Sequence, residues 1–364
     1  MKLRNLVLAT LLSVFTVTAQ TEDLTKPSPC RPDGAPLPST ANGDFIFAVL
    51  GDTGQGCEDE PRQCQLASTM ETVQRATRFG TMFLLGDNVY TWGKTKEIPE
   101  KIFQPYRQLA RQGVVVRGVV GNHDVISRRA SELQTRFFIA PDAAAQERDY
   151  FSKDIKELIQ PKGTTLTYYN RSEQNNLVEF FALDSSLIVG DYVKWFFWKS
   201  HPSKAERAAH LKWFTDKVRA STAKWKIVVM HHPMYSSADY HGVVEVDAAG
   251  NPVASEVPKE IQILRREIEP LLIELGVQLV LTGHDHGYER IKPQQGIQHF
   301  VSGAGAKTRE NDYDRTKRKH KRFANFHECG SVETSFMLFS ATRDKIDFWN
   351  VGLAGNVIDY GPIR

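Results

Sequence analysis

The chain has 364 residues, of which 41% are apolar and 24% are charged, and its formal net charge at pH 7 is +3. This composition excludes a disordered or fibrous protein and is sufficient for a large buried core, in one large domain or two ordinary ones. The small net charge argues against a general nucleic-acid binder.

The first residues resemble an export signal. Lys2 and Arg4 precede an apolar run at 6–17, and Val17-Thr18-Ala19 offers small residues where a signal peptidase cleaves. A membrane anchor is the alternative. The run is too short to span a bilayer well, however, and no second candidate follows it. We therefore expect a cleaved signal peptide at 1–19 and no stable membrane span.

We expect the rest of the chain to form one domain after a short N-terminal segment. We predict an N-terminal extension at 20–43 and a single domain at 44–364, in a secreted or periplasmic protein. Removing residues 1–19 lowers the formal charge from +3 to +1, because Lys2 and Arg4 are the only charged residues in that segment.

Four cysteines follow the predicted signal: Cys30, Cys57, Cys64 and Cys329. An even number in an oxidising compartment indicates disulfides. Cys57 and Cys64 would close a short loop and would leave the other two to join the ends of the chain. The sequence leaves this connectivity open, and some of the thiols could stay reduced. The spacing matches no zinc module.

Apolar runs alternate with stretches of helical spacing along the domain. The runs predict strands at 45–50, 82–85, 114–120, 179–183, 227–230, 278–282 and 299–302, and the tail predicts two more at 335–339 and 345–351. The stretches between them predict helices at 68–79, 100–112, 203–221 and 258–275. Because no low-complexity linker or internal repeat interrupts this pattern, we expect one layered α/β domain.

Five of the predicted strands run into side chains that can bind metals. The segments are GDTG at 51–54, GDNVY at 86–90, GNHD at 121–124, HHP at 231–233 and GHDH at 283–286. Any one of them could be a capped turn or a buried structural histidine. Because open α/β sheets place ligand sites at the carboxyl ends of their strands, the five together predict a metal site at that edge.

These motifs resemble those of the purple acid phosphatases, in the small mammalian-type branch of the calcineurin-like metallophosphoesterases. The family pattern is Asp-x-Gly, Gly-Asp-x-x-Tyr, Gly-Asn-His followed by an acid, Val-x-x-His and Gly-His-x-His, and the sequence has all five in this order. The resemblance runs from about residue 45 to the carboxyl end. It implies a single-domain, layered sandwich of two mixed β-sheets flanked by helices.

The resemblance also implies two metal ions. The first, iron(III), would be bound by Asp52, Asp87, Tyr90 and His286. The second, Fe(II), Zn or Mn, would be bound by Asp87, Asn122, His231 and His284. Gly54 stands where most metallophosphoesterases have a histidine. Tyr90 fills that vacancy with a phenolate, a hard donor that favours a trivalent ion.

The implied activity is that of an acid phosphatase acting on phosphate monoesters, either small molecules or phosphoproteins. Two cations would bind the phosphoryl oxygens and acidify a coordinated water into a hydroxide nucleophile. His123 and His241 match the two substrate-facing histidines of the family, which assist the leaving group. A solvated loop histidine is the alternative for His241, because the segment from Pro233 to His241 is one residue longer than the family pattern.

Two other functions stay open. A non-catalytic surface or scaffold relative would have degenerate ligands, whereas all seven ligand positions are intact here. A calcineurin-like phosphodiesterase or nucleotidase with two divalent ions is disfavoured by Gly54 and Tyr90. The sequence does not specify the oligomeric state.

Two further segments have no place in these motifs. The basic segment 317–322 predicts a charged surface loop, with recruitment of anionic substrates as the alternative. The aromatic segment 192–198 predicts core packing, with a substrate platform or a partner-docking surface as the alternative.

Overall fold

The computed structural model describes most of the predicted domain. The described residues are 30, 35–39, 44–159, 165–190, 202–243, 245–310, 312–313 and 323–363. The predicted signal peptide and the segments 192–198 and 317–322 therefore lie outside the described residues. Within the described part of the chain, no helix has both the length and the apolar character needed to cross a membrane.

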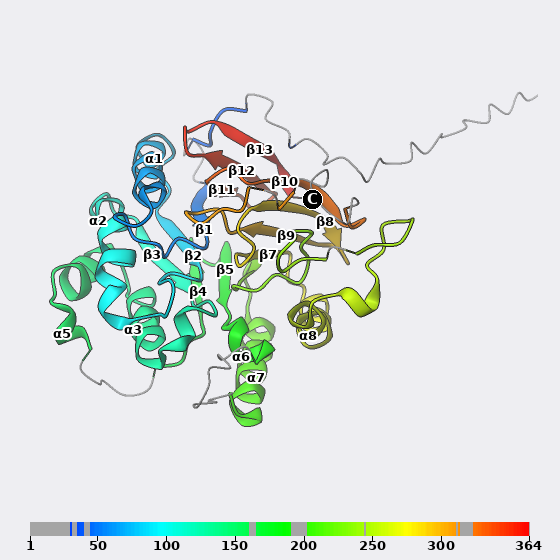
Figure 1. Cartoon of the computed structure of the whole chain (residues 1–364). Coiled ribbons are helices and arrows are strands. Elements are labelled where there is room, and N and C mark those ends of the chain that lie inside the picture. The colour runs from blue at the N-terminus through cyan, green and yellow to red at the C-terminus, as the bar shows by residue number, and fades with distance from the viewer. Residues whose placement is uncertain are drawn as a thin grey trace, which may run out of the picture.

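Two mixed β-sheets form the centre of the fold, and helices flank them, so the predicted architecture is confirmed (Figure 1). The first sheet has the order β13-β12-β11-β1-β2-β3. Its strands are β1 (Phe45–Leu50), β2 (Thr81–Leu85), β3 (Val115–Val119), β11 (Ser335–Ala341), β12 (Ile346–Gly352) and β13 (Val357–Ile363). In this sheet β1, β2 and β3 are parallel and end at one edge, whereas β11, β12 and β13 form antiparallel pairs on the other side.

The second sheet has the order β10-β8-β9-β7-β6-β5-β4. Its strands are β4 (Tyr169–Glu173), β5 (Val178–Ala182), β6 (Trp225–Val229), β7 (Leu279–Thr282), β8 (Tyr288–Gln294), β9 (Ile297–Ser302) and β10 (His327–Ser331). Strands β5, β6, β7 and β9 run parallel to one another. Their carboxyl ends therefore meet at one edge, as those of β1, β2 and β3 do in the first sheet.

Helices cover the outer face of each sheet (Figure 1). On the side of the first sheet these are α1 (Pro61–Thr77), α2 (Gln104–Arg111), α3 (Arg128–Phe138), α4 (Ala143–Gln146) and α5 (Ile155–Leu158). On the side of the second they are α6 (Ser185–Val189), α7 (Lys204–Ala220), α8 (Lys259–Glu267) and α9 (Glu269–Glu274). Short 3₁₀ or π-helical turns lie at Thr95–Glu97, Pro99–Phe103, Asp124–Ile126, Glu147–Phe151 and Ala254–Glu256.

Strand β1 shows how the two apolar layers arise from one sequence. Alternate side chains point to opposite faces of a strand. Ile46 and Leu50 accordingly pack with the helix-side core, whereas Phe47 and Val49 pack between the two sheets. The ring centroids of Phe47 and Phe180 of β5 lie 5.0 Å apart across this inner layer. Burial on both faces explains why the strand has a continuous apolar sequence.

The largest differences from the predicted helix boundaries are at α8 and α9 and at the start of α1. The prediction of a single helix at 258–275 is wrong, because the chain divides into α8 and α9 at Ile268. Pro270 lies in the first turn of α9, where its missing N–H group is tolerated, but it could not donate within a longer helix. Helix α1 begins at Pro61, seven residues before the predicted start at residue 68, and the Glu60 side chain caps it.

The disulfide connectivity, which the sequence left open, is Cys30–Cys329 and Cys57–Cys64. The first bond spans 299 residues and joins the N-terminal extension to β10. The second closes the segment that leads into α1, directly after the first metal motif. Both bonds restrict the unfolded chain, and the long loop restricts it more.

Candidate metal centre

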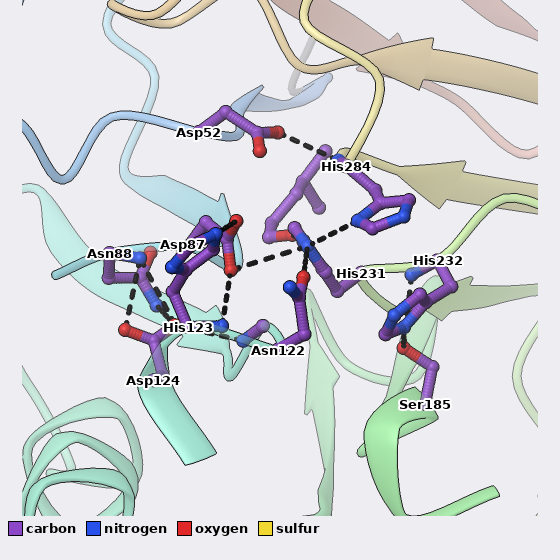
Figure 2. Close-up of polar contacts among 12 residues, drawn as sticks. Asp52, Asp87, Asn88, Asn122, His123, Asp124, Ser185, His231, His232 and His284 are labelled. Carbon is purple, nitrogen blue, oxygen red and sulfur yellow. Dashed lines mark hydrogen bonds and ion pairs between the residues drawn. The ribbon is translucent and has the colours of Figure 1, made fainter. Parts of the chain in front are cut away.

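All five predicted motifs lie where the carboxyl ends of the parallel strands of both sheets meet. Asp52, Asp87 and Asn122 follow β1, β2 and β3 of the first sheet, whereas His231 and His284 follow β6 and β7 of the second. Figure 2 shows these side chains turned toward one another across the gap between the sheets. Both sheets thus contribute residues to the site.

Backbone strain is concentrated in these turns. Asp52, Asp87 and His284 have positive φ angles of 60°, 52° and 72°. Such angles cost roughly 1–2 kcal/mol for a residue with a Cβ atom and persist only where neighbouring structure holds them. Adjacent turns supply that support here: the Asp52 N–H donates to the Gly86 carbonyl at 3.0 Å.

Gly54 explains why the first motif has no histidine at its third position. A Cβ atom at Gly54 would lie 2.3 Å from the carbonyl carbon of Asn88, so no side chain fits. The Gly54 N–H donates to the Asp87 carbonyl at 3.0 Å, and its own carbonyl accepts from the Tyr90 N–H at 2.7 Å. The space of a histidine is therefore occupied by the loop that carries the tyrosine.

One group of ligand atoms converges around the Tyr90 hydroxyl. This hydroxyl donates to Asp52 Oδ1 at 2.8 Å and lies 3.3 Å from His286 Nε2. His286 Nε2 lies 3.6 Å from the same Asp52 oxygen. The three atoms thus surround a small volume that is lined by two oxygens and one nitrogen, all on buried residues.

A second group converges around His231 Nε2. This atom lies 3.0 Å from Asn122 Oδ1, 3.1 Å from His284 Nδ1 and 3.4 Å from Asp87 Oδ1 (Figure 2). His231 Nδ1 donates to the Leu85 carbonyl at 2.8 Å, which fixes the tautomer and leaves the Nε2 lone pair for a ligand. One carboxylate oxygen each of Asp52 and Asp87 and one nitrogen of His231 lie within 4.8 Å of one another, so the two groups adjoin.

The protonation states in this pocket suit a cation. Burial lowers the pKa of His231 to about 4, and burial also holds the pKa of His284 well below its usual value. Both imidazoles are therefore neutral and able to coordinate. Burial, followed by the charge of Asp87, raises the pKa of Asp52, and burial together with both carboxylates raises that of Tyr90. A bound cation would reverse these last two shifts.

The two predicted catalytic histidines lie beside the ligand groups. His123 Nε2 is 3.9 Å from Asp87 Oδ2, and its Nδ1 donates to the Thr91 carbonyl at 2.7 Å. The His241 ring stacks on His284 with centroids 4.0 Å apart. Burial lowers the pKa of His241 to about 3. The His241 ring thus lies against a proposed ligand, and its catalytic role stays a prediction.

Supporting residues were not assigned roles from the sequence. The Asp124 carboxylate accepts from the backbone N–H groups of Gly121, Asn88 and Val89 at 2.8–3.1 Å, which ties the second and third motifs together (Figure 2). Burial raises the pKa of Asp124 to about 7. Ser185 likewise holds His232, with its Oγ 2.8 Å from Nδ1. Asp124 could be recognised in the sequence as the acid of the third motif, but the backbone N–H groups that donate to it could not.

The two-sheet fold is that of the metallophosphoesterases. A family model described as calcineurin-like phosphoesterase matches residues 45–288. The chain therefore belongs to the calcineurin-like phosphoesterase family.

Purple acid phosphatases are among its relatives, as the motif resemblance implied. Purple acid phosphatase 17 of Arabidopsis thaliana is 26% identical over 285 residues, which cover 76% of this chain and 72% of the relative. Tartrate-resistant acid phosphatase type 5 of Homo sapiens is 24% identical over 303 residues, which cover 79% of this chain and 81% of the relative.

Two solved structures share the fold. GAP50, the anchor in the inner membrane complex of Plasmodium, has a TM-score of 0.62 at 17% identity, covering 88% of this chain and 89% of that one. The purple acid phosphatase PPD1 from yellow lupin (Lupinus luteus) seeds has a TM-score of 0.60 at 14% identity, covering 89% of this chain and 54% of that one. At these identities the likeness concerns the fold alone.

Proposed function

We propose that the protein is an exported acid phosphatase that hydrolyses phosphate monoesters with an iron(III) and a divalent ion. The observation that carries this proposal is the pair of convergent ligand groups, one of which contains a phenol. Purple and tartrate-resistant acid phosphatases among the relatives support the same chemistry. Export is proposed from the signal-like segment at 1–19.

The donor set fits the implied metals. Asp52, Asp87, Tyr90 and His286 would hold the ferric ion, because two carboxylates and a phenolate are hard, charged donors. Asp87, Asn122, His231 and His284 would hold Fe(II), Zn or Mn, since two imidazoles suit a divalent ion. When bound, the two cations would compensate the charge of the phosphoryl oxygens and make a water acidic enough to attack phosphorus.

The side chains around the ligands have separate tasks in this proposal. His123 holds a proton for the leaving alkoxide, and the Thr91 carbonyl keeps its ring oriented by accepting from Nδ1. His241 would contact the phosphoryl oxygens from the side of His284. Asp124 keeps the loops of Asp87 and Asn122 in register through its three backbone contacts.

A non-catalytic scaffold is the second candidate, because the fold is shared with the anchor protein GAP50. The intact ligand groups favour the enzyme. A phosphodiesterase with two divalent ions is opposed by the tyrosine in the first ligand group.

The test combines metal analysis with hydrolysis of matched substrates. We expect one iron and one further metal per purified chain, and hydrolysis of p-nitrophenyl phosphate below pH 7 that exceeds hydrolysis of bis(p-nitrophenyl) phosphate. Preference for the diester would contradict the monoesterase. Two bound metals without hydrolysis of either ester would favour the scaffold. Sequencing of the mature N-terminus tests export, with residue 20 expected first.

A further inference from the structure

Two cationic side chains border the metal centre on the loop that follows β9. The backbone of this loop is attached to the ligand residues: the Lys307 N–H donates to the Asp52 carbonyl, and the Arg309 N–H donates to the His286 carbonyl, both at 3.3 Å. Between them, Thr308 Oγ1 accepts from Arg62 at 2.8 Å. The loop is therefore held at the centre on one side and at the start of α1 on the other.

Both head groups lie against side chains that are proposed as metal ligands. Lys307 Nζ is 4.2 Å from the centroid of the Tyr90 ring. Arg309 Nε donates to His286 Nδ1 at 3.1 Å, and its guanidinium lies 3.4 Å from the centroid of the Tyr240 ring. Tyr240 is 63% exposed. The Arg309 guanidinium thus lies between a proposed ligand and an exposed ring.

The acidic groups that act on the two cations belong to the centre itself. The charge of Arg309 acts on Asp285, which stands between the proposed ligands His284 and His286 in the sequence. The acidic groups that attract Lys307 are Asp52 and Asp87, which the proposed function assigns to metals. Once metals are bound, that attraction is offset, and two cations border a cationic centre. Such an arrangement is unfavourable unless an anion lies between them.

The position of Arg309 is fixed from two sides. Its Nε donates to His286 Nδ1, and its guanidinium packs on the Tyr240 ring. Because a guanidinium has five N–H donors, this arrangement places further donors next to a proposed ligand.

We propose that Lys307 and Arg309 form an anion subsite that binds a second anionic group of the substrate, next to the phosphate that is hydrolysed. This inference rests on the proposed phosphatase function and specifies its substrate class: phosphate esters with a further phosphate or carboxylate close to the scissile phosphate. A lysine and an arginine suit this role, because both present several donors to phosphate or carboxylate oxygens.

The experiment measures binding without turnover. Propylphosphonate has one anionic group, whereas 3-phosphonopropionate has the same chain length and a second one. Isothermal titration of the metal-loaded full chain gives both dissociation constants, with metal content measured before and after. We expect the second anionic group to tighten binding about tenfold in the natural protein, as a charge-assisted contact allows.

Three variants locate the effect. Lys307→Met and Arg309→Met should each reduce the tenfold advantage of 3-phosphonopropionate over propylphosphonate to about threefold or less. Lys307→Arg should retain most of it. Lys224→Met is the matched control, because Lys224 Nζ also lies over an aromatic ring, 5.3 Å from the Trp225 centroid, but precedes β6 at the opposite end of the sheet. It should leave both affinities unchanged.

The outcomes separate this inference from the function on which it rests. An equal advantage for 3-phosphonopropionate in the natural protein and in both Met variants would overturn the subsite, as would failure of 3-phosphonopropionate to bind the natural protein. Hydrolysis of p-nitrophenyl phosphate by the same preparations tests the phosphatase independently. A Lys307-dependent advantage in a preparation that does not hydrolyse the ester would support the subsite and contradict the enzyme.

Discussion

Tyr90 differs from an ordinary buried tyrosine because its hydroxyl is surrounded by other groups that can bind a cation. The hydroxyl donates to Asp52 and lies close to His286. Burial, then Asp52 and Asp87, raises the pKa of Tyr90, so the phenol keeps its proton in the absence of metal. Only a strongly Lewis-acidic ion can displace that proton at acidic pH, which is the physical reason for preferring iron(III).

Replacing Tyr90 by phenylalanine should therefore remove colour without unfolding the protein. We expect the metal-loaded protein to show a visible charge-transfer band from phenolate to iron(III), and Tyr90→Phe to lack it. Absorption spectra, iron content and thermal melting check this. Tyr106→Phe is the control, since Tyr106 is equally buried but lies in α2 within the helix-side core. A colourless natural protein with stoichiometric iron would contradict the assignment.

Asp87 is the one side chain proposed to bind both ions, and its substitution should affect both. Asp87→Asn removes a negative charge between two cations, which then repel each other with less compensation. We expect at most one metal per chain and activity at least about 100-fold lower.

His284→Ala provides the comparison for Asp87→Asn, because His284 belongs only to the second ligand group. It should keep iron and colour but lose the divalent ion and most activity. Metal analysis together with the visible spectrum distinguishes the two patterns. Two metals and near-normal activity in Asp87→Asn would exclude a shared carboxylate.

At the scale of elements, the strands that can be predicted from the sequence are those with a continuous apolar run. The parallel strands β1, β2, β6 and β7 are buried on both faces, so their runs stand out. Strand β4, with the sequence YNRSE, lies at the edge of its sheet and is partly exposed, so no apolar run marks it. The other strands that were not predicted are β8, β10 and β13. The helices that were not predicted are α3, α4, α5 and α6.

The site likewise contains residues that could be predicted from the sequence and residues that could not. Motifs at the ends of parallel strands could be grouped from the sequence, because such strands share an edge. Lys307 and Arg309 could not, since they reach the centre through the course of a loop that has no fixed spacing to any motif. Asp124 was visible as an acid, but its bonds to the neighbouring turn depend on the backbone path of that turn.

Helix α7 contains a buried histidine that should make the protein sensitive to acid. His210 stacks on Tyr168 with ring centroids 4.0 Å apart, and neither ring nitrogen has a hydrogen-bond partner among the described residues. Burial lowers the pKa of His210 to about 3. The unfolded chain takes up a proton near pH 6.5, whereas the folded chain stays neutral, so stability falls as the pH drops from 6.5 toward 3.

His210→Phe should therefore stabilise the protein more at low pH than at neutral pH. At pH 5 the histidine lowers the free energy of unfolding by about 2 kcal/mol, a loss that phenylalanine does not suffer. Urea unfolding at pH 5 and at pH 7.5 measures the difference. Tyr168→Phe is the control, because it alters the stacking partner without adding a group that titrates in this range. An equal gain at both pH values would show that packing, and not protonation, decides the outcome.

For the whole molecule, the proposed centre is a cross-link between two layers. Asp52, Asp87 and Asn122 belong to the first sheet, whereas His231 and His284 belong to the second. Metals that bind only the folded arrangement stabilise it by mass action, by about 4 kcal/mol when the free ion exceeds its dissociation constant a thousandfold. The Cys30–Cys329 disulfide acts differently, since it restricts the unfolded chain and lies on edge strand β10.

The two contributions should therefore add. Removing the metals with a chelator should lower the free energy of unfolding by several kcal/mol. The double substitution Cys30→Ala and Cys329→Ala should lower it by roughly 3–5 kcal/mol. Because the disulfide and the metals act on different states of the chain, the loss caused by the chelator should be the same with and without the disulfide.

Denaturation of the four preparations measures this cycle, with the visible band reporting whether iron is retained. If the chelator has no effect on the disulfide-free protein, the disulfide is needed to assemble the centre. If the chelator leaves the free energy of unfolding of the natural protein unchanged, the metals do not cross-link the two sheets.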